Sequence, residues 1–187
     1  MDSMDINTVR LGFLGHATFR GGEAYRGGIL ITDGNGKPLE FRSTSPVKPN
    51  ALQRTLYGAG MMTHIAIELL GVPLLKSLQE KPSIILINEE IFFGVRLYVE
   101  TALFRLQQQQ NADSSPPAAH VKNNDGILTS TANYTPVVVT PHGSYPDDLP
   151  TCKPILTEVF SRMDLHEPFE RLEHAITYVH ENKLLEE

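Results

Sequence analysis

Two acidic pairs, Glu89–Glu90 and Asp147–Asp148, each come shortly after an apolar run of the sequence. Carboxylate oxygens are the ligands that Mg²⁺ prefers, and two-metal nucleases and phosphodiesterases use such ions to stabilise the attacking and leaving oxygens. We therefore take Glu89, Glu90, Asp147, Asp148 and the nearby His142 as candidate catalytic residues, and Glu89, Asp147 and Asp148 as candidate ligands of Mg²⁺ or Mn²⁺. The competing interpretation, which we favour for Glu89 and Glu90, is an acidic first turn of a helix, stabilised by the helix dipole.

His142 lies in the segment "TPHGSYPDD", directly after a short apolar run that predicts a strand. Loops at the carboxyl ends of strands are where α/β proteins bind ligands, so a small-ligand site near Asn88 and His142 is a separate hypothesis. A surface loop ordered by its prolines explains the same residues more simply. Cys152, next to Lys153, is a weak candidate nucleophile, because the sequence fixes no histidine partner beside it.

The segment "GGILITDGNGKPLEFRST" (27–44) is rich in glycine but does not match a phosphate-binding loop. Gly34, Gly36 and Lys37 are too close together for the pattern GxxxxGK followed by Ser or Thr, and strand-like residues follow instead of a helix. Glycine and asparagine allow the positive φ angles of a tight turn. We therefore predict a β-hairpin here, with Asp33 stabilising the turn.

Hydrophobic periodicity predicts the elements that would position these residues. Strands are expected over residues 9–19, 27–33 and 38–44, and a buried strand is expected over 82–90, where the apolar run is continuous. Helices are expected over 50–81 and 93–110, and a further strand and two helices towards the C-terminus. The apolar faces of the first two helices would be Leu52, Leu56, Met62, Ile65 and Leu69, and Val95, Val99, Ala102, Leu103 and Leu106.

These elements predict one α/β domain built on a mixed sheet, with an antiparallel three-stranded N-terminal part and helices on the sheet faces. Residues 1–106 would form the first part of the core. Residues 107–133 are polar and contain proline, so we expect a flexible insertion there. Residues 134–187 would complete the same domain with the last strand and the C-terminal helices.

The order of elements resembles that of ribonuclease H-like proteins: three antiparallel strands, a helix, a parallel strand, a helix, a further strand and a final helix. The resemblance implies carboxylates from the first strand, the end of the fourth strand and the last strand or helix, which together hold Mg²⁺. Glu89 and Glu90 fill the fourth-strand position. The first strand has no acid, and only Gly12, Gly15 and His16 stand where the central carboxylate is expected.

The last predicted helix carries apolar residues at a spacing of four and three. This spacing serves either packing on a sheet or docking to a partner helix. Core packing is the commoner explanation, but the long polar insertion and the C-terminal helix together favour an assembly role. The candidate docking residues are Leu165, Phe169, Leu172 and Ile176.

The overall charge and hydrophobicity of the chain argue against some classes of protein. A net charge of −6, from 16 basic and 22 acidic residues, argues against a general nucleic-acid binder. The N-terminus does not match a signal peptide, and no apolar run approaches the ~20 residues of a membrane span, so we expect a cytoplasmic protein that is not embedded in a membrane.

No complete catalytic motif is present in the sequence. We therefore expect a non-catalytic accessory or interaction subunit of a soluble cytoplasmic assembly, with a protein partner or a second copy and no cofactor. The alternative is a metal-dependent nuclease or phosphodiesterase with an incomplete ribonuclease H-like carboxylate site.

Overall fold

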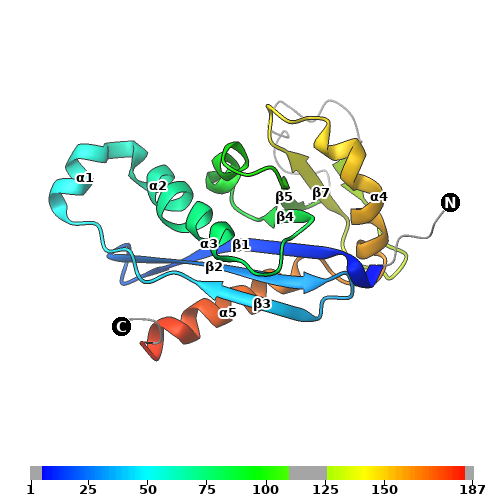
Figure 1. Ribbon diagram of the computed structural model, residues 1–187, viewed down its shortest axis with the longest axis horizontal. Coiled ribbons are helices and arrows are strands. Elements are labelled where there is room, and N and C mark those ends of the chain that lie inside the picture. Colours follow the sequence, from blue (N-terminus) through cyan, green and yellow to red (C-terminus); the bar gives the residue numbers. More distant parts are fainter. Residues whose placement is uncertain (1–5, 110–125, 184–187) are drawn as a thin grey trace.

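Three antiparallel strands open the fold, and the first two are rich in apolar residues that are buried at consecutive positions. The computed structural model describes residues 6–109 and 126–183. A short 3₁₀ turn, η1 (Ile6–Thr8), is followed by the strands β1 (Arg10–Phe19), β2 (Ala24–Asp33) and β3 (Pro38–Ser43). The ten residues of β1 pair with β2 from Arg10↔Asp33 to Phe19↔Ala24 without a break in register. This confirms the predicted antiparallel N-terminal part (Figure 1).

The glycine-rich segment is the turn between β2 and β3, as predicted. The Asp33 side chain accepts hydrogen bonds from the backbone N–H groups of Asn35 (2.9 Å) and Lys37 (3.0 Å). Gly36 has a φ of 82°, which is why glycine is needed at this position. Asp33 is therefore a turn residue.

A long helical segment follows β3 and changes geometry along its length. It runs through α1 (Ala51–Tyr57), η2 (Gly58–Gly60), α2 (Met61–His64), the π-helical η3 (Ile65–Gly71) and α3 (Val72–Ser77). Asn50 and Gln53 form a reciprocal capping box at its start. A helix was predicted here, but the predicted apolar face is wrong, since Leu52 and Leu56 are 66% and 73% exposed. The buried residues are Met61, Ile65, Ala66, Leu70, Val72 and Leu74.

The exposed first part of this segment projects away from the sheet, whereas α3 lies against it (Figure 1). By length and composition alone, Ala51–Ser77 passes the test for a membrane-spanning helix, with 44% of the most apolar window buried. Core helices pass the same test. The packing of η3 and α3 on β2 identifies the second half as a core helix.

The predicted buried strand is β4 (Ile84–Ile87), which pairs in parallel with β1, Leu14 opposite Ile87. The helix predicted over residues 93–110 is wrong: a 3₁₀ helix, η4 (Glu90–Leu97), leads into β5 (Ala102–Gln108), which is parallel to β4. Leu103, Phe104 and Leu106 are all buried because β5 lies between two strands with helices over both faces. A strand that is covered on both faces loses the alternation of apolar and polar residues. The apolar spacing of β5 therefore also fitted a helix.

The sheet is completed by β6 (Ile127–Leu128) and β7 (Val137–Pro141), and its strand order is β3-β2-β1-β4-β5-β7-β6. The bounds of the predicted insertion, 107–133, are wrong, since Gln107 and Gln108 belong to β5 and Ile127–Leu128 form β6, which pairs with β7. Residues 110–125 lie outside the described part of the chain.

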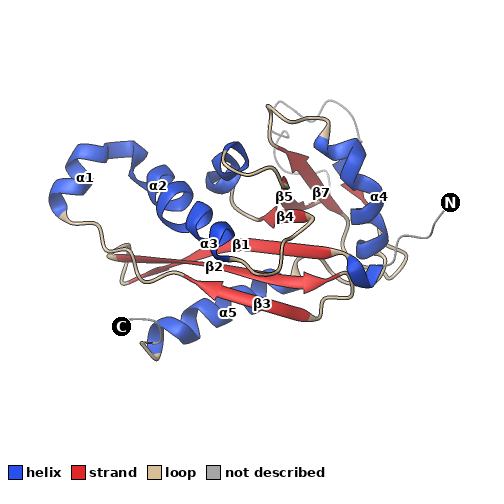
Figure 2. Ribbon diagram, in the orientation of Figure 1, coloured by secondary structure: helices blue, strands red, loops and turns tan. Residues whose placement is uncertain are grey.

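Helices lie over both faces of the sheet (Figure 2), which gives the α/β architecture that was predicted, and each face carries an apolar layer. On one face, α4 (Asp148–Phe160) and α5 (Glu167–Glu181) pack against Phe13, Leu86 and Phe104. On the other face, η3, α3 and η4 pack against Leu14 and Ile87. Side chains alternate along each strand, so odd and even positions of β1 serve different layers.

Candidate functional site

β4 ends between β1 and β5, which both continue past it. Leu14 of β1, Ile87 of β4 and Arg105 of β5 are aligned across two parallel pairings. Leu14, Ile87 and Leu103 face the layer formed by η3, α3 and η4. By strand alternation, His16 and Arg105 lie on that same face, and Glu89 follows Ile87 beyond the end of β4. These three residues form the edge cluster.

The centre of the edge cluster is a contact between His16 and Glu89. His16 Nδ1 is 3.0 Å from Glu89 Oε1, and the two side chains are 10% and 43% exposed. The distance is that of an ion pair, although the geometry does not satisfy a hydrogen bond and Nδ1 is shielded from solvent. The rings of Phe92 and Tyr25 lie 5.7 Å and 6.4 Å from the imidazole, so His16 is held between aromatic side chains.

A second charged pair lies beside it. Arg105 Nη1 donates to Glu90 Oε2 at 2.8 Å, and the arginine side chain is 25% exposed. Arg105 Nε is buried and has no hydrogen-bond partner among the described residues. The guanidinium therefore keeps donors beyond those used by Glu90. Glu90 also stands in the first turn of η4, as the acidic-turn interpretation predicted.

Asn88 points to the other side of the sheet. Its Oδ1 lies 3.9 Å from where a Cβ would stand on Gly15, and that position also approaches Leu172 of α5. His142 follows β7, accepts a hydrogen bond from the backbone N–H of Ser144, and contacts the rings of Phe93 and Tyr145. The hypothesis of a ligand site shared by Asn88 and His142 therefore has no supporting contact among the described residues.

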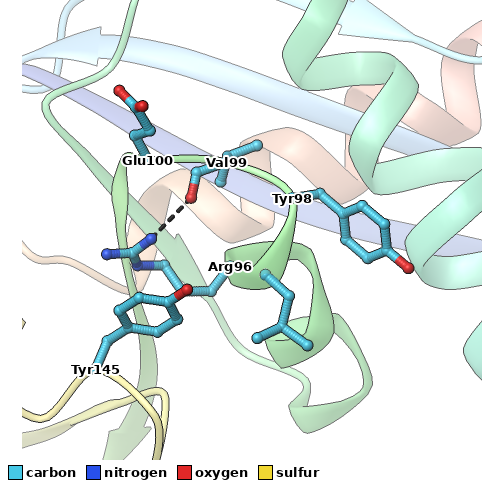
Figure 3. Close-up of a pocket in the computed structure, with 6 residues that line it drawn as sticks. Arg96, Tyr98, Val99, Glu100 and Tyr145 are labelled. Carbon is cyan, nitrogen blue, oxygen red and sulfur yellow. Dashed lines mark hydrogen bonds between the residues drawn. The ribbon is translucent and has the colours of Figure 1, made fainter.

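Asp148 is held by a buried arginine at a different place in the fold. Arg96 donates to both Asp148 oxygens, at 2.9 Å and 3.3 Å, and its guanidinium lies 3.8 Å from the centroid of the Tyr145 ring. A third hydrogen bond runs from Arg96 to the Val99 carbonyl (Figure 3). The hydrogen bond to Asp148 raises the pKa of Arg96 above its ordinary value despite burial. Arg96 and Tyr145 help to line an open cavity of about 430 Å³, and Asp148 is not among its lining residues.

The two acidic pairs come from strands that run in opposite directions. β5 and β7 are antiparallel, with Phe104 opposite Pro141, so β7 ends towards the edge where β5 begins. Asp147 and Asp148 thus start α4 away from the edge that carries Glu89 and Glu90. Within residues 6–109 and 126–183, no group of three or more His, Cys, Asp or Glu side chains could hold a metal ion. The described donors do not fit a divalent cation held by the protein alone.

Cys152 and the candidate docking residues are part of the core. Burial, followed by the nearby charge of Asp148, raises the pKa of the Cys152 thiol, which disfavours the nucleophilic thiolate. All four side chains proposed for docking are buried under α5 or at its start, so they are not open to a partner helix. They are Leu165, Phe169, Leu172 and Ile176.

Sequence reasoning missed His16 and Arg105 as members of a site. His16 was noted only as a residue standing where an acid was expected, and Arg105 was placed on a helix that does not form. One feature of the sequence could have found His16. It is two residues beyond Leu14, so both side chains lie on the same face of β1. Using this feature required the β1–β4 pairing, which the sequence does not reveal.

Comparison of the sequence with models of protein families and with curated proteins finds no match. Solved structures are similar in fold. Endonuclease V from Streptomyces avermitilis superposes with a TM-score of 0.55 at 12% identity, covering 95% of this chain and 83% of that chain. Endonuclease V from Bacillus subtilis gives 0.52 at 16% identity, covering 95% and 84%. Endonuclease V from Ciona intestinalis, bound to DNA containing an inosine followed by a ribo-adenosine, gives 0.50 at 13% identity, covering 80% and 77%.

These similarities correct the function expected from the sequence. The structures that share this architecture across most of the chain are nucleases, which contradicts the expectation of an accessory subunit acting through protein–protein interaction. The predicted ribonuclease H-like topology is confirmed. The chain has the mixed α/β, ribonuclease H-like fold of the endonuclease V structures.

Proposed function

We propose that this chain is a nuclease that breaks phosphodiester bonds in nucleic acid at the edge cluster of His16, Glu89 and Arg105. The observation that carries the proposal is the His16–Glu89 contact of 3.0 Å, which joins β1 to the end of β4. An imidazole whose Nδ1 faces a carboxylate is oriented to exchange a proton through Nε2. The similarity in fold to endonuclease V supports the same class of reaction.

The three residues have complementary chemistry for this reaction. His16 supplies a group that accepts a proton from the attacking oxygen. Glu89 positions the imidazole. Arg105 supplies a positive charge at the same edge, and a guanidinium binds phosphate oxygens through several donors. The net charge of −6 is a property of the whole chain and does not remove this local cation.

The endonuclease V fold also suggests that a divalent cation takes part. Glu90 and Asp148 are engaged by Arg105 and Arg96, which leaves Glu89 as the carboxylate of the edge cluster that no arginine holds. Mg²⁺ commonly uses one or two protein carboxylates together with substrate phosphates. Mg²⁺ and Mn²⁺ are therefore included as conditions of the assay, and no step is assigned to them.

Cleavage assays with purified protein test the proposal. The substrates are end-labelled single- and double-stranded DNA, single-stranded RNA, and DNA carrying an inosine followed by a ribo-adenosine, each with Mg²⁺, with Mn²⁺ and with EDTA. We expect cleavage of at least one substrate, reduced at least tenfold by Glu89→Gln, since positioned acid–base groups contribute about 10² to 10⁴.

A matched control is available in the same chain. His64 of α2 and Glu68 of η3 form another His–Glu contact, 3.2 Å apart, outside the edge cluster. Glu68→Gln should cleave like the unaltered protein. Intact substrates in all three conditions, or equal losses in Glu89→Gln and Glu68→Gln, would contradict the proposed function.

A further inference from the structure

We infer that His16 cleaves RNA by transesterification at the 2′-hydroxyl, without a protein-held divalent cation. This inference rests on the proposed nuclease function and specifies its substrate and chemistry. It follows from the contents of the edge cluster, in which an imidazole on β1 faces the carboxylate that follows β4.

The contacts around His16 make it a proton acceptor with a fixed direction. Glu89 lies 3.0 Å from Nδ1, and Phe92 and Tyr25 confine the ring. In the tautomer with its proton on Nδ1, the nitrogen nearest Glu89, Nε2 has a free lone pair. His16 is the catalytic residue in this scheme, and Glu89 is a positioning residue.

The carboxylates near the edge favour this chemistry over a cation held in a cage. Arg105 binds Glu90, and the antiparallel direction of β7 keeps Asp148 with Arg96. The described residues contain no group of three possible metal ligands. Positive charge at the edge is instead supplied by Arg105, which engages Glu90 through Nη1 and whose side chain is 25% exposed. It stabilises the extra negative charge on the phosphate oxygens as the new bond forms.

RNA fits a site with one base and one cation better than DNA does. Its 2′-hydroxyl is already beside the phosphorus atom, and intramolecular nucleophiles gain effective molarities that reach about 10⁵ to 10⁸ M. DNA lacks this hydroxyl and needs an external water to be positioned and activated. A single imidazole is therefore sufficient to start the reaction on RNA.

The reaction exchanges the bond from phosphorus to O5′ for a bond from phosphorus to O2′. His16 Nε2 takes the proton of the 2′-hydroxyl, and O2′ forms a bond to phosphorus while the bond from phosphorus to O5′ breaks. The leaving O5′ takes a proton from water, and the hydroxide so formed takes the proton from the imidazolium. The products are a 2′,3′-cyclic phosphate and a free 5′-hydroxyl, and neutral His16 is regenerated.

The test uses the full chain and a single-stranded RNA with its all-deoxy counterpart, in EDTA and in Mg²⁺. We expect cleavage of RNA in EDTA, no cleavage of the deoxy strand in EDTA, and cyclic phosphate ends detected by mass spectrometry. His16→Asn should lower the rate by about 10² or more. Because His16 is largely buried, circular dichroism must show that this variant is folded, and His64→Asn is its matched control.

Glu89 requires readouts that a merely structural residue would not affect. Glu89→Gln should lower kcat more than it changes KM, and Glu89→Asp should restore part of the loss, because it keeps a carboxylate near Nδ1. If His16→Asn proves unfolded, the Glu89 series decides the matter.

The outcomes separate this inference from the proposed function. Cleavage only with Mg²⁺ or Mn²⁺, giving 3′-hydroxyl and 5′-phosphate ends, overturns the inference and leaves the nuclease function standing. Cleavage in EDTA that is unchanged in folded His16→Asn, or insensitive to the Glu89 series, also overturns it. No cleavage of any nucleic acid in any condition overturns both.

Discussion

The carboxylates of this chain differ in the groups that lie against them. Asp33 is held by two backbone N–H groups of its own turn, Asp148 by Arg96, and Glu90 by Arg105. Glu89 meets an imidazole instead. The difference matters for function, because an arginine cannot give up its proton, whereas a histidine exchanges one near neutral pH.

Glu40 gives a test of stability at the residue scale. Burial alone would raise its pKa, but hydrogen bonds from the backbone N–H groups of Glu80 and Gln79 and from Arg42 together hold the pKa below its ordinary 4.5. A lowered pKa stabilises the fold above about pH 4.5, and this contribution is lost as the pH falls through the folded-state value. Glu40→Gln should lower the free energy of unfolding by about 1 kcal/mol at pH 7.

Urea denaturation at pH 7 and pH 3 checks this expectation. The difference between Glu40→Gln and the unaltered protein should shrink at pH 3, because the unfolded chain there binds a proton at this carboxyl, which the folded chain disfavours. Glu173→Gln, on the exposed side of α5, serves as the control and should change little at either pH. An undiminished difference at pH 3 would show that the ionised carboxylate of Glu40 is not what stabilises the fold.

At the scale of elements, α5 belongs to the core of the sheet. The Phe169 ring meets Phe13 edge-on at 5.3 Å, and Ile176 fills the space above Gly28, where an added Cβ would lie 2.6 Å from it. The four-three spacing therefore reflects packing on β1 and β2. A helix that docks to a partner protein would carry the same apolar spacing. The spacing alone therefore does not distinguish packing on the sheet from docking.

Phe169→Asp should consequently unfold the protein instead of releasing a partner. An unpaired charge placed against Phe13 costs several kcal/mol, a large part of the stability of an ordinary domain. Thermal unfolding followed by circular dichroism measures the effect. Tyr178→Asp, on the exposed face of the same helix, should leave the melting temperature within a few degrees. A folded Phe169→Asp monomer would contradict the core role.

At the scale of the whole molecule, two apolar layers share one sheet. Strands β1, β4 and β5 contribute alternate side chains to both layers, so neither layer can form without the same three strands. The C-terminal helices α4 and α5 cover strands from the first and last parts of the chain. This interleaving predicts that the two layers lose structure together.

Equilibrium unfolding in urea tests the prediction. Far-ultraviolet circular dichroism and tyrosine fluorescence should give coincident transitions with one midpoint, as two-state unfolding requires. Tyrosine is the natural probe because the chain has six tyrosines and no tryptophan. Two separated transitions would show that the layers unfold independently.

The predictions from the sequence succeeded where the structure depends on residues that are close together in the chain. The hairpin at Asp33 depends on residues within four positions of one another, and β4 depends on a continuous apolar run. Both were predicted. β5 failed because its apolar spacing is produced by neighbours on both faces, and these come from distant segments.

By itself, then, the sequence determined the antiparallel strands at the start, the tight turn at Asp33, the buried β4 and the apolar stripe of α5, because short-range backbone chemistry and side-chain periodicity encode them. Tertiary structure alone decided which functional groups meet. Parallel pairing of β1 with β4 brings His16 to Glu89, and antiparallel pairing of β7 takes Asp148 to Arg96. Strand direction and register depend on contacts between residues far apart in the chain, and no local pattern specifies them.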